Sequence, residues 1–208
     1  TIYGITSIDT LLPILVNHIE KTTHDRLTRG TGHQFQLIKD FVQQIEPLAI
    51  AVIACKITFD KVFSHKKGSN NLTNICDSIG NAVEDECQMR HYEEKAPGLL
   101  ATLKKNYWHK SIGTNQKIVV IQTLMNRYNV DKWVPWDRAN RIKLGAWLLD
   151  CIIETSGWFY KNTVREGRRT VNYIVPTPEF TQIKDKIMED SELFAPLSWP
   201  MLIEPNDW

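Results

Sequence analysis

Four basic side chains gather in a short segment near the C-terminal end of the chain. Lys161, Arg165, Arg168 and Arg169 surround one carboxylate, Glu166. Positive charge at this density suits a polyanion better than a protein core. The formal net charge of the whole chain is only +1, so any affinity for nucleic acid must come from local patches of this kind.

Val164 lies beside these charges in the sequence. An apolar side chain on a cationic finger can act as a wedge that unstacks base pairs. The alternative is a solvated surface hairpin whose charged edge prevents aggregation. We take the valine and the four cations as a candidate nucleic-acid contact.

A β-hairpin would position these residues. Two runs rich in aromatic and β-branched residues, Trp158–Val164 and Arg169–Val175, flank the turn-forming segment Arg165–Arg168. This pattern predicts two antiparallel strands. The predicted hairpin covers residues 158–175, and one short helix is expected after it.

Two polar segments are further candidate contact surfaces. Thr22–Gly32 combines threonines and glycines with Arg26 and Arg29, a composition that predicts a loop with exposed positive charge. Ser64–Asn71 is a second predicted loop. Its two adjacent lysines are most simply solubilising, and a phosphate contact is the alternative.

The sequence is poor in catalytic constellations. The carboxylates of Glu84–Glu86 are consecutive and project in different directions on a helix, so a solvated helix face is the favoured interpretation. The six histidines lack the spacing of a metal-binding motif, and Gly30–Gly32 lacks the lysine of a phosphate-binding loop. The four cysteines are too widely spaced for a zinc site or a disulfide framework. We assign no catalytic and no metal-binding residue.

Length and composition predict a globular protein. The chain has 208 residues, of which 42% are hydrophobic, enough for a sizeable core in one large domain or two small ones. Its longest apolar run, Leu48–Cys55, is far shorter than the roughly 20 residues of a membrane span. We expect a soluble protein. Because the chain begins at Thr1 without a methionine and stops at Trp208 in a Pro-rich segment, we also expect a fragment of a longer protein.

Most of the chain before the hairpin has helical periodicity. The first helix is expected to fade at Lys21, with Pro13 tolerable only in its first turn, and Gly157 is expected to stop the last helix. Pro47 is expected in the first turn of a buried central helix. The predicted fold class is mainly α, a multi-helix domain with one protruding β-hairpin near the C-terminal end. The predicted helices start near Ile8, Gln34, Leu48, Leu72, Gly98, Ile112 and Arg138. All except the one from Gly98 have predicted ends, which lie near Lys21, Pro47, Phe63, Met89, Tyr128 and Thr155.

Five segments, taken in order, carry a family resemblance. They read IEPLAIAVIACKITF (Ile45–Phe59), IGNAVEDECQMRHYE (Ile79–Glu93), GAWLLDCIIETSGWF (Gly145–Phe159), IVPTPEF (Ile174–Phe180) and WPMLIEPNDW (Trp199–Trp208). The combination of IGNAVEDE with a terminal PML-x-x-P-x-x-W is the most specific part. With these segments the chain resembles the N-terminal domain of single-subunit DNA-directed RNA polymerases of the bacteriophage and mitochondrial type. One departure is that the family's usual Pro-Pro pair before the final tryptophan is absent.

The resemblance implies roles for the two basic segments. Residues 158–175 would be an intercalating hairpin at the upstream edge of the transcription bubble, with Val164 as the wedge and the four cations on phosphates. The stretch Thr22–His33, with Arg26 and Arg29, would contact AT-rich upstream promoter DNA in the minor groove.

The resemblance also implies partners and a cofactor. The partners would be double-stranded promoter DNA, nascent RNA and a C-terminal polymerase domain, with no membrane. The intact protein would be a DNA-directed RNA polymerase, a nucleotidyltransferase whose Mg²⁺ is held by aspartates outside this chain, while residues 1–208 need no cofactor. A phage enzyme would act in the cytoplasm of a bacterial host, and a mitochondrial enzyme is the alternative.

Two hypotheses of other classes stay open at this stage. The chain could be a stand-alone helical DNA-binding or interaction module without catalytic activity, or a small independent enzyme. Activity of this chain alone would test the small enzyme, and the reading frame after Trp208 discriminates the polymerase from the module. Several hundred further codons with a palm aspartate motif would favour the polymerase, whereas a stop codon would favour the module.

Overall fold

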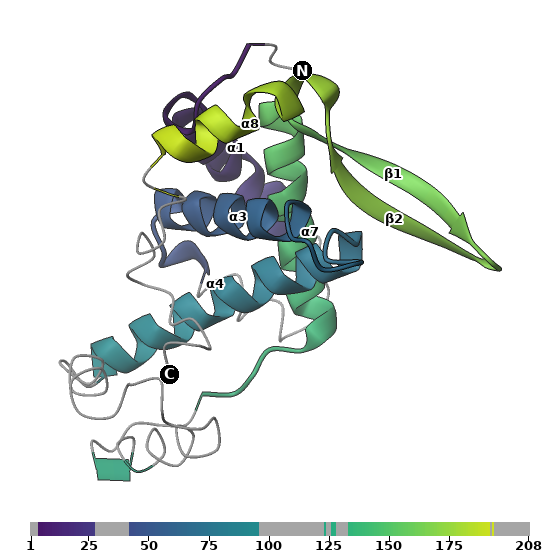
Figure 1. Cartoon of the computed structure of the whole chain (residues 1–208). Helices are drawn as coiled ribbons and strands as arrows, with labels where there is room; N and C mark the ends of the chain where they lie inside the picture. The colour runs from purple at the N-terminus through teal and green to yellow at the C-terminus, as the bar shows by residue number, and fades with distance from the viewer. Residues whose placement is uncertain are drawn as a thin grey trace. The chain divides into compact units, whose positions relative to one another are not determined.

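The computed structural model describes residues 4–27, 42–95 and 133–191, together with residues 123, 126, 127 and 193; side chains in the first range are described as far as residue 23. Within these residues the chain is mainly α with one antiparallel hairpin near the C-terminal end, which confirms the predicted fold class. The elements, labelled as in Figure 1, are α1 (Ile8–Leu27), α3 (Pro47–Val62), α4 (Leu72–Lys95), α7 (Arg138–Ser156), β1 (Phe159–Glu166), β2 (Arg169–Pro176) and α8 (Pro178–Asp190).

The contacts divide the chain into two compact units. The first comprises Thr1–Val83 and Trp136–Ser198, and the second comprises Glu84–Pro135 and Trp199–Trp208. The hairpin, α1, α3, α7 and α8 all belong to the first unit.

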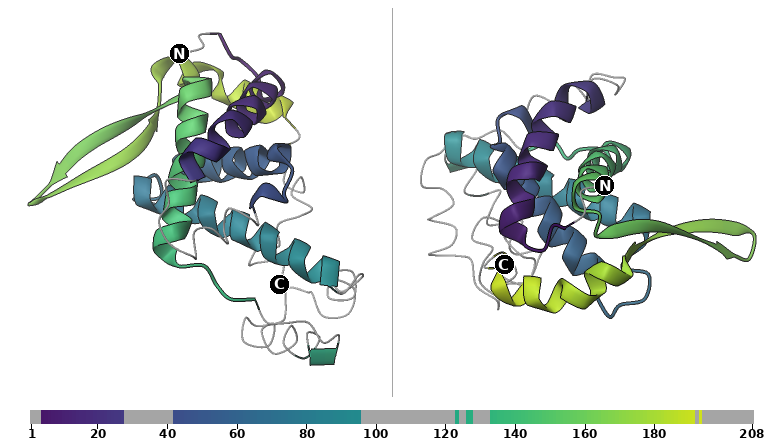
Figure 2. Two further views of the ribbon diagram at one scale, coloured as in Figure 1. Left: turned by 180° about the vertical axis from the view of Figure 1, so that it is seen from behind. Right: turned by 90° about the horizontal axis from the view of Figure 1, so that it is seen from above.

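The core of the first unit lies where α1, α3 and α7 pack on one another (Figure 2). Leu11 and Leu15 of α1, Ala54 of α3, and Leu144 and Leu148 of α7 have no exposed surface. The central helix predicted from Leu48 is therefore confirmed as α3. On α7 the buried face is centred on Leu144, Leu148 and Ile152, whereas Ile142, Ala146 and Ile153 are half-buried.

Two of the predicted helix-end signals, Pro47 and Gly157, are confirmed. Ser7 caps α1, since its Oγ accepts a hydrogen bond from the Thr10 amide at 3.1 Å. Pro47 is the first residue of α3, where its missing N–H costs nothing. Gly157 ends α7 in the left-handed conformation at φ 66°. Pro13 is the exception, because it lies inside α1 and not in the first turn.

The prediction that the first helix fades at Lys21 is wrong. Helix α1 continues to Leu27, so the first six residues of the predicted loop Thr22–Gly32 are helical. The hydroxyls of Thr22 and Thr23 donate to the carbonyls of His18 and Ile19, four residues earlier, which lets both threonines sit within a helix. The Trp147 indole also donates to Thr22 Oγ1 at 2.9 Å, so tertiary contact outweighs the loop-forming composition.

Other predicted helices fall partly or wholly outside the described residues. Of the helix predicted from Gln34 to Pro47, residues 42–47 are described. Val42 and Gln43 are helical, but Gln44–Glu46 are not and Pro47 begins α3, so this helix ends earlier than predicted. The helices predicted from Gly98 and from Ile112 lie outside the described residues except for isolated positions. Helix α4 extends to Lys95, beyond its predicted end at Met89.

Helices α4 and α7 cross in backbone contact through two glycines. A Cβ added at Gly80 of α4 would lie 2.2 Å from the Arg141 carbonyl oxygen, and one at Gly145 of α7 would lie 1.8 Å from the Cys76 carbonyl oxygen. No side chain fits at either position. Both glycines belong to the sequence segments that carry the family resemblance, so those motifs encode a helix crossing.

Ion pairs reinforce this crossing. The Asp77 carboxylate of α4 lies 3.4 Å from the Nε atoms of both Arg138 and Arg141 of α7. Arg141 also donates to the Trp136 carbonyl at 2.8 Å. The start of α7 is therefore held to α4 by charge as well as by close packing.

All four cysteines, Cys55, Cys76, Cys87 and Cys151, are free and buried, in agreement with the prediction that they form no disulfide framework. Burial raises the thiol pKa to about 12 in Cys55 and about 11 in Cys76, which keeps them protonated at neutral pH. Among the described residues, no helix combines the length and apolar character that a membrane crossing requires.

Replacing Gly145 by alanine should destabilise the fold by about 3 kcal/mol, because the methyl group would push α7 off the backbone of α4. Urea denaturation followed by circular dichroism measures the change. Asn81→Ala, at an exposed position of α4, is the control and should cause no loss. A Gly145→Ala protein as stable as the Asn81→Ala protein would contradict the close crossing.

Candidate nucleic-acid interface

The hairpin grows directly out of α7. Gly157 reverses the chain at the end of the helix, and β1 then pairs antiparallel with β2 from Phe159 opposite Pro176 to Glu166 opposite Arg169. The turn is a two-residue loop, Gly167 and Arg168, and not the predicted four-residue segment. Gly167 has φ 62°, a conformation that the tight loops of two-residue hairpins require and that glycine adopts without strain.

An aromatic cluster anchors the hairpin at its base. The Phe59 ring of α3 lies 5.9 Å from the Trp158 ring and 5.7 Å from the Phe159 ring, both edge-on, and 5.6 Å from the Phe180 ring of α8. Trp158 and Phe180 stack with centroids 4.7 Å apart. The Thr177 amide closes the base by donating to the Trp158 carbonyl at 2.9 Å. The strands therefore leave a rigid root, and their far ends lie away from the helices of the first unit (Figure 1).

The pairing register gives the hairpin two unlike faces. Directly opposed residues share a face, and successive residues alternate between faces. We call the face that begins with the buried Phe159 and Ile174 the anchor face, and the other the outer face. Beyond its root the anchor face is polar, with Thr163 donating to Asn172 at 2.7 Å. The outer face consists of Tyr160, Asn162, Val164, Glu166, Arg169, Val171, Tyr173 and Val175.

The outer face is rich in apolar groups, of which Tyr160 and Val164 are exposed and Val171, Tyr173 and Val175 are half-buried. Val164 is 37% exposed and lies opposite Val171, and Tyr160 is 45% exposed. Val164 thus lies outside the packed interior, but two residues of β1 separate it from the turn, so it is not at the tip. Sequence reasoning selected Val164 and missed the neighbours on its face, although the alternation of β2 from Val171 to Val175 could have revealed them.

The four predicted cations differ in surroundings. Arg165, Arg168 and Arg169 are exposed, and among the described residues no carboxylate lies within ion-pair distance of them. Lys161 lies nearer the root, with its Nζ 3.4 Å from the Asp150 carboxylate of α7. Its charge is partly neutralised, which makes it the weakest candidate of the four for a phosphate contact.

Glu166, the carboxylate within this cluster, is held on the outer face. The Tyr173 hydroxyl donates to it at 2.5 Å, and Arg169 is its cross-strand neighbour. The hydrogen bond to Glu166 and its negative charge raise the pKa of Tyr173, because both favour the neutral phenol. The carboxylate is therefore tied to a tyrosine and forms no ion pair with the described arginines around it, and three arginines against one glutamate leave the end of the hairpin positive.

The predicted loop Ser64–Asn71 contacts the edge of β2 that does not pair with β1. The Ile174 amide donates to the Asn70 carbonyl at 2.9 Å, and the Asn70 side chain donates back to the Ile174 carbonyl at 3.1 Å. Asn71 forms a bridge with Tyr173. At this level β2 lies between β1 and the loop, a contact between distant segments that no sequence signal indicated.

The second predicted contact surface lies mostly beyond the described residues. Arg26 has a described backbone, which is in α1, while its side chain is outside the description, and Arg29 lies entirely outside it. Their contact with DNA stays a prediction.

The interpretation of Glu84–Glu86 as a solvated helix face is wrong for two of its three residues. Glu84 accepts a hydrogen bond from the Trp133 indole at 3.0 Å, and the buried Glu86 pairs with Arg90 at 2.7 Å. Only Asp85 is exposed. Each buried carboxylate has a polar partner, which offsets the cost of burial and makes the role structural. Among the described residues, no group of three or more His, Cys, Asp or Glu could hold a metal ion.

Replacing Glu166 by glutamine should lower the pKa of Tyr173 toward the ordinary tyrosine value of 10.0, because the negative charge that favours the neutral phenol is lost. Since the pKa is raised in the folded protein, the contribution of this contact is complete below pH 10 and is lost as the pH rises through the raised value. Titration of the phenolate absorbance measures this pKa. Subtracting the titration curve of Tyr173→Phe isolates the signal of Tyr173. An unchanged titration in Glu166→Gln would contradict the contact.

Replacing Asn70 by alanine should loosen the hairpin root. Loss of a hydrogen bond worth about 1 kcal/mol should accelerate amide exchange at Ile174 about fivefold. Hydrogen exchange followed by NMR measures this rate. Asn172→Ala removes a side-chain bond further along the hairpin and is the matched control. Equal acceleration at Ile174 in both variants would argue against a specific role for Asn70.

Comparison with known proteins assigns the chain to a family. The chain is 22% identical over 171 residues to the DNA-directed RNA polymerase of Enterobacteria phage K11, an alignment that covers 77% of this chain and 19% of that protein. The chain thus spans about a fifth of the length of this curated relative. The family described as DNA-directed RNA polymerase N-terminal matches residues 9–208, which include every described helix and strand except the first residue of α1. By this match, which confirms the resemblance seen in its sequence, the chain belongs to the DNA-directed RNA polymerase N-terminal family.

Proposed function

We propose that this chain binds upstream promoter DNA and stabilises the melted bubble, while a C-terminal polymerase domain of the intact protein synthesises RNA on the DNA template. The observation that carries the proposal is the hairpin itself: a two-stranded finger, rooted in an aromatic cluster, with exposed arginines around its turn and the pair Val164 and Val171 on its outer face. The family membership supports the same function.

The arginines supply affinity for phosphates. Arg165, Arg168 and Arg169 are exposed near the free end, where a DNA backbone has access to all three. Guanidinium groups pair with phosphate oxygens and release condensed counterions, and the binding they provide does not depend on base sequence. In this proposal the cations hold the finger against DNA, and base recognition comes from elsewhere, with Arg26 and Arg29 the candidates.

The outer face supplies the wedge. Val164 and its cross-strand partner Val171 form an apolar pair just behind the charged turn, and Tyr173 is the next outer-face residue toward the root. Apolar side chains inserted at a base step unstack it, and aromatic rings stack on exposed bases. An apolar pair at this position would cover the last base pair of the duplex while the turn passes between the strands. The hairpin would therefore slow reannealing and leave the chemistry of synthesis untouched.

In this proposal the described residues hold DNA and carry out no step of RNA synthesis. In the intact protein nucleotidyl transfer would need Mg²⁺, and the described residues offer no cluster to hold it, so no step of the reaction is assigned to them. Double-stranded promoter DNA, nascent RNA and the polymerase domain are the proposed partners. For a phage protein the proposed setting is the cytoplasm of the bacterial host.

Replacing Val164 by aspartate tests the wedge in the intact protein. Open-complex formation on linear duplex promoter should fall at least about fivefold, from loss of roughly 1 kcal/mol of stacking, and transcription from a premelted bubble should be largely preserved. Permanganate reactivity of unpaired thymines reports opening, and a footprint of the intact protein locates the promoter beforehand.

Thr163→Asp is the matched control, because it places the same charge one residue away on the opposite face. It should leave opening close to the native level. Equal loss of transcription on duplex and premelted templates with Val164→Asp, or equal loss of opening with both variants, would count against the wedge.

A further inference from the structure

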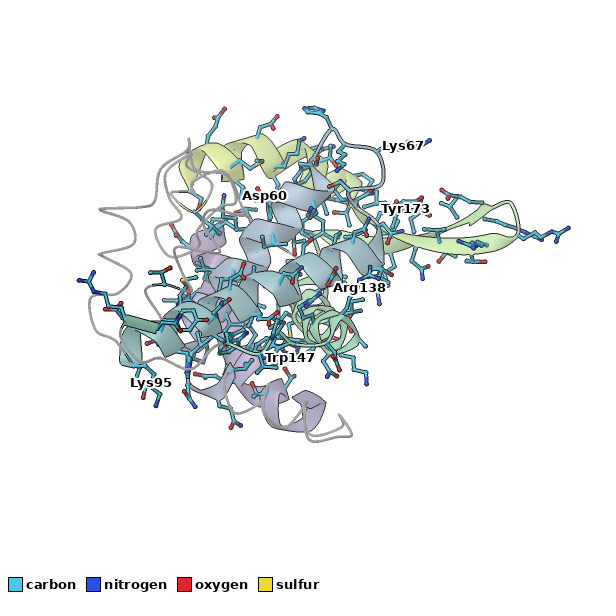
Figure 3. All side chains as sticks on the ribbon, turned by 90° about the horizontal axis from the view of Figure 1, so that it is seen from below. Asp60, Lys67, Lys95, Arg138, Trp147 and Tyr173 are labelled. Atoms are coloured by element: carbon cyan, nitrogen blue, oxygen red, sulfur yellow. The ribbon has the colours of Figure 1, made fainter. Side chains whose placement is uncertain are left out.

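A second group of exposed cations lies beside the hairpin, in the loop between α3 and α4. His65, Lys66 and Lys67 are all exposed, and among the described residues no carboxylate pairs with either lysine. Figure 3 shows Lys67 extending outward from this loop on the side from which the hairpin leaves, with Tyr173 at the hairpin's base. The loop therefore presents positive charge next to the root of the finger.

The carboxylates that flank the loop in sequence do not cancel this charge, because both already face cations. Asp60, near the end of α3, lies 3.9 Å from Lys56. Asp77, in the second turn of α4, faces both Arg138 and Arg141. The positive end of the α4 dipole also lies at this loop and adds to the potential.

The backbone holds the lysines at a defined place. The Ser69 amide donates to the Lys66 carbonyl, and the Asn71 amide donates to the Gly68 carbonyl, both at 3.1 Å. Gly68 takes the left-handed conformation, at φ 78°, that this tight turn requires. Two hydrogen bonds between Asn70 and Ile174 then fasten the loop to β2.

The two edges of the hairpin consequently differ in charge. Along the β2 edge, the loop is bonded at Tyr173, and Arg169 lies four residues earlier in the sequence, roughly 13 Å further out along the strand. On β1, Lys161 is paired with Asp150 and only Arg165 is without such a partner among the described residues. A strand of nucleic acid that follows the β2 edge would meet cations at the turn and again at the loop beside the root.

We propose that Lys66 and Lys67 bind phosphates of one single-stranded DNA segment, which runs along the β2 edge of the hairpin after the two strands have been separated. This inference rests on the proposed function, because it needs the hairpin to lie between the strands. A finger between two strands leaves one at each edge, and the cationic β2 edge selects which strand is held. Single-stranded DNA is favoured over duplex because a single backbone can bend from the turn to the loop.

The test measures binding of the intact protein, with Lys66→Ala/Lys67→Ala, to forked DNA that has a duplex stem and two unpaired arms. Equilibrium binding is followed by fluorescence anisotropy over a range of salt concentrations. Removing two single-strand phosphate contacts should make the slope of log Kobs against log salt concentration shallower by roughly 1.4. On a blunt duplex of the same stem the slope should be unchanged.

Lys95→Ala/Lys186→Ala is the matched control. It removes the same charge from two exposed lysines in the last turn of α4 and in α8, outside the loop and the hairpin. The control should keep the native slope on the fork. Forks that lack one arm or the other identify the strand, since the loop variant should respond to the loss of only one of them.

The outcomes distinguish the phosphate contact of Lys66 and Lys67 from the proposed function of the hairpin. If Lys66→Ala/Lys67→Ala keeps the native salt dependence on forked DNA while Val164→Asp still impairs opening, the phosphate contact is overturned. The hairpin proposal then still stands. An equal change on fork and blunt duplex would overturn the single-strand assignment in favour of a duplex contact. If Val164→Asp has no effect on opening, the proposed function fails, whatever the slope.

Discussion

The close crossing of α4 and α7 is the constraint on which the hairpin's placement depends. Gly80 and Gly145 let the two backbones touch, and one end of each helix leads to the hairpin. The C-terminal end of α7 leads into β1, and the loop that precedes α4 is bonded to β2. The positions of both strands therefore depend on the same helix crossing. If α4 moved relative to α7, the start of β1 would move relative to the loop that supports β2.

The chain separates its apolar and charged functions along the hairpin. At the root, Phe59, Trp158, Phe159 and Phe180 form a packed aromatic cluster. At the free end the arginines are exposed. A nearly neutral chain can in this way present a strongly positive surface, because its arginines gather on a projecting hairpin. The carboxylates of Asp77, Glu84 and Glu86 meanwhile have partners on the helices or near them.

The elements could be predicted from sequence better than their contacts. Pro47, Gly157 and the two runs rich in aromatic and β-branched residues are local signals, and each marked an observed boundary or element. Residues Thr22–Leu27 look like a loop by composition, yet α1 includes them because Trp147, far along the chain, bonds to Thr22. Burial of Glu84 depends in the same way on Trp133. Pairings between distant residues leave no periodic pattern in the sequence. The contact between β2 and the loop Ser64–Asn71 therefore could not be predicted.

The two-residue turn has a consequence for how such a finger can vary. Because the loop at Gly167 is already as short as a hairpin allows, its reach changes only when residues enter both strands together. Each added pair would carry the arginines roughly 3.3 Å further out, and a second pair would restore their original sides. Relatives can thus deepen or shorten the finger by matched insertions without repacking a single helix.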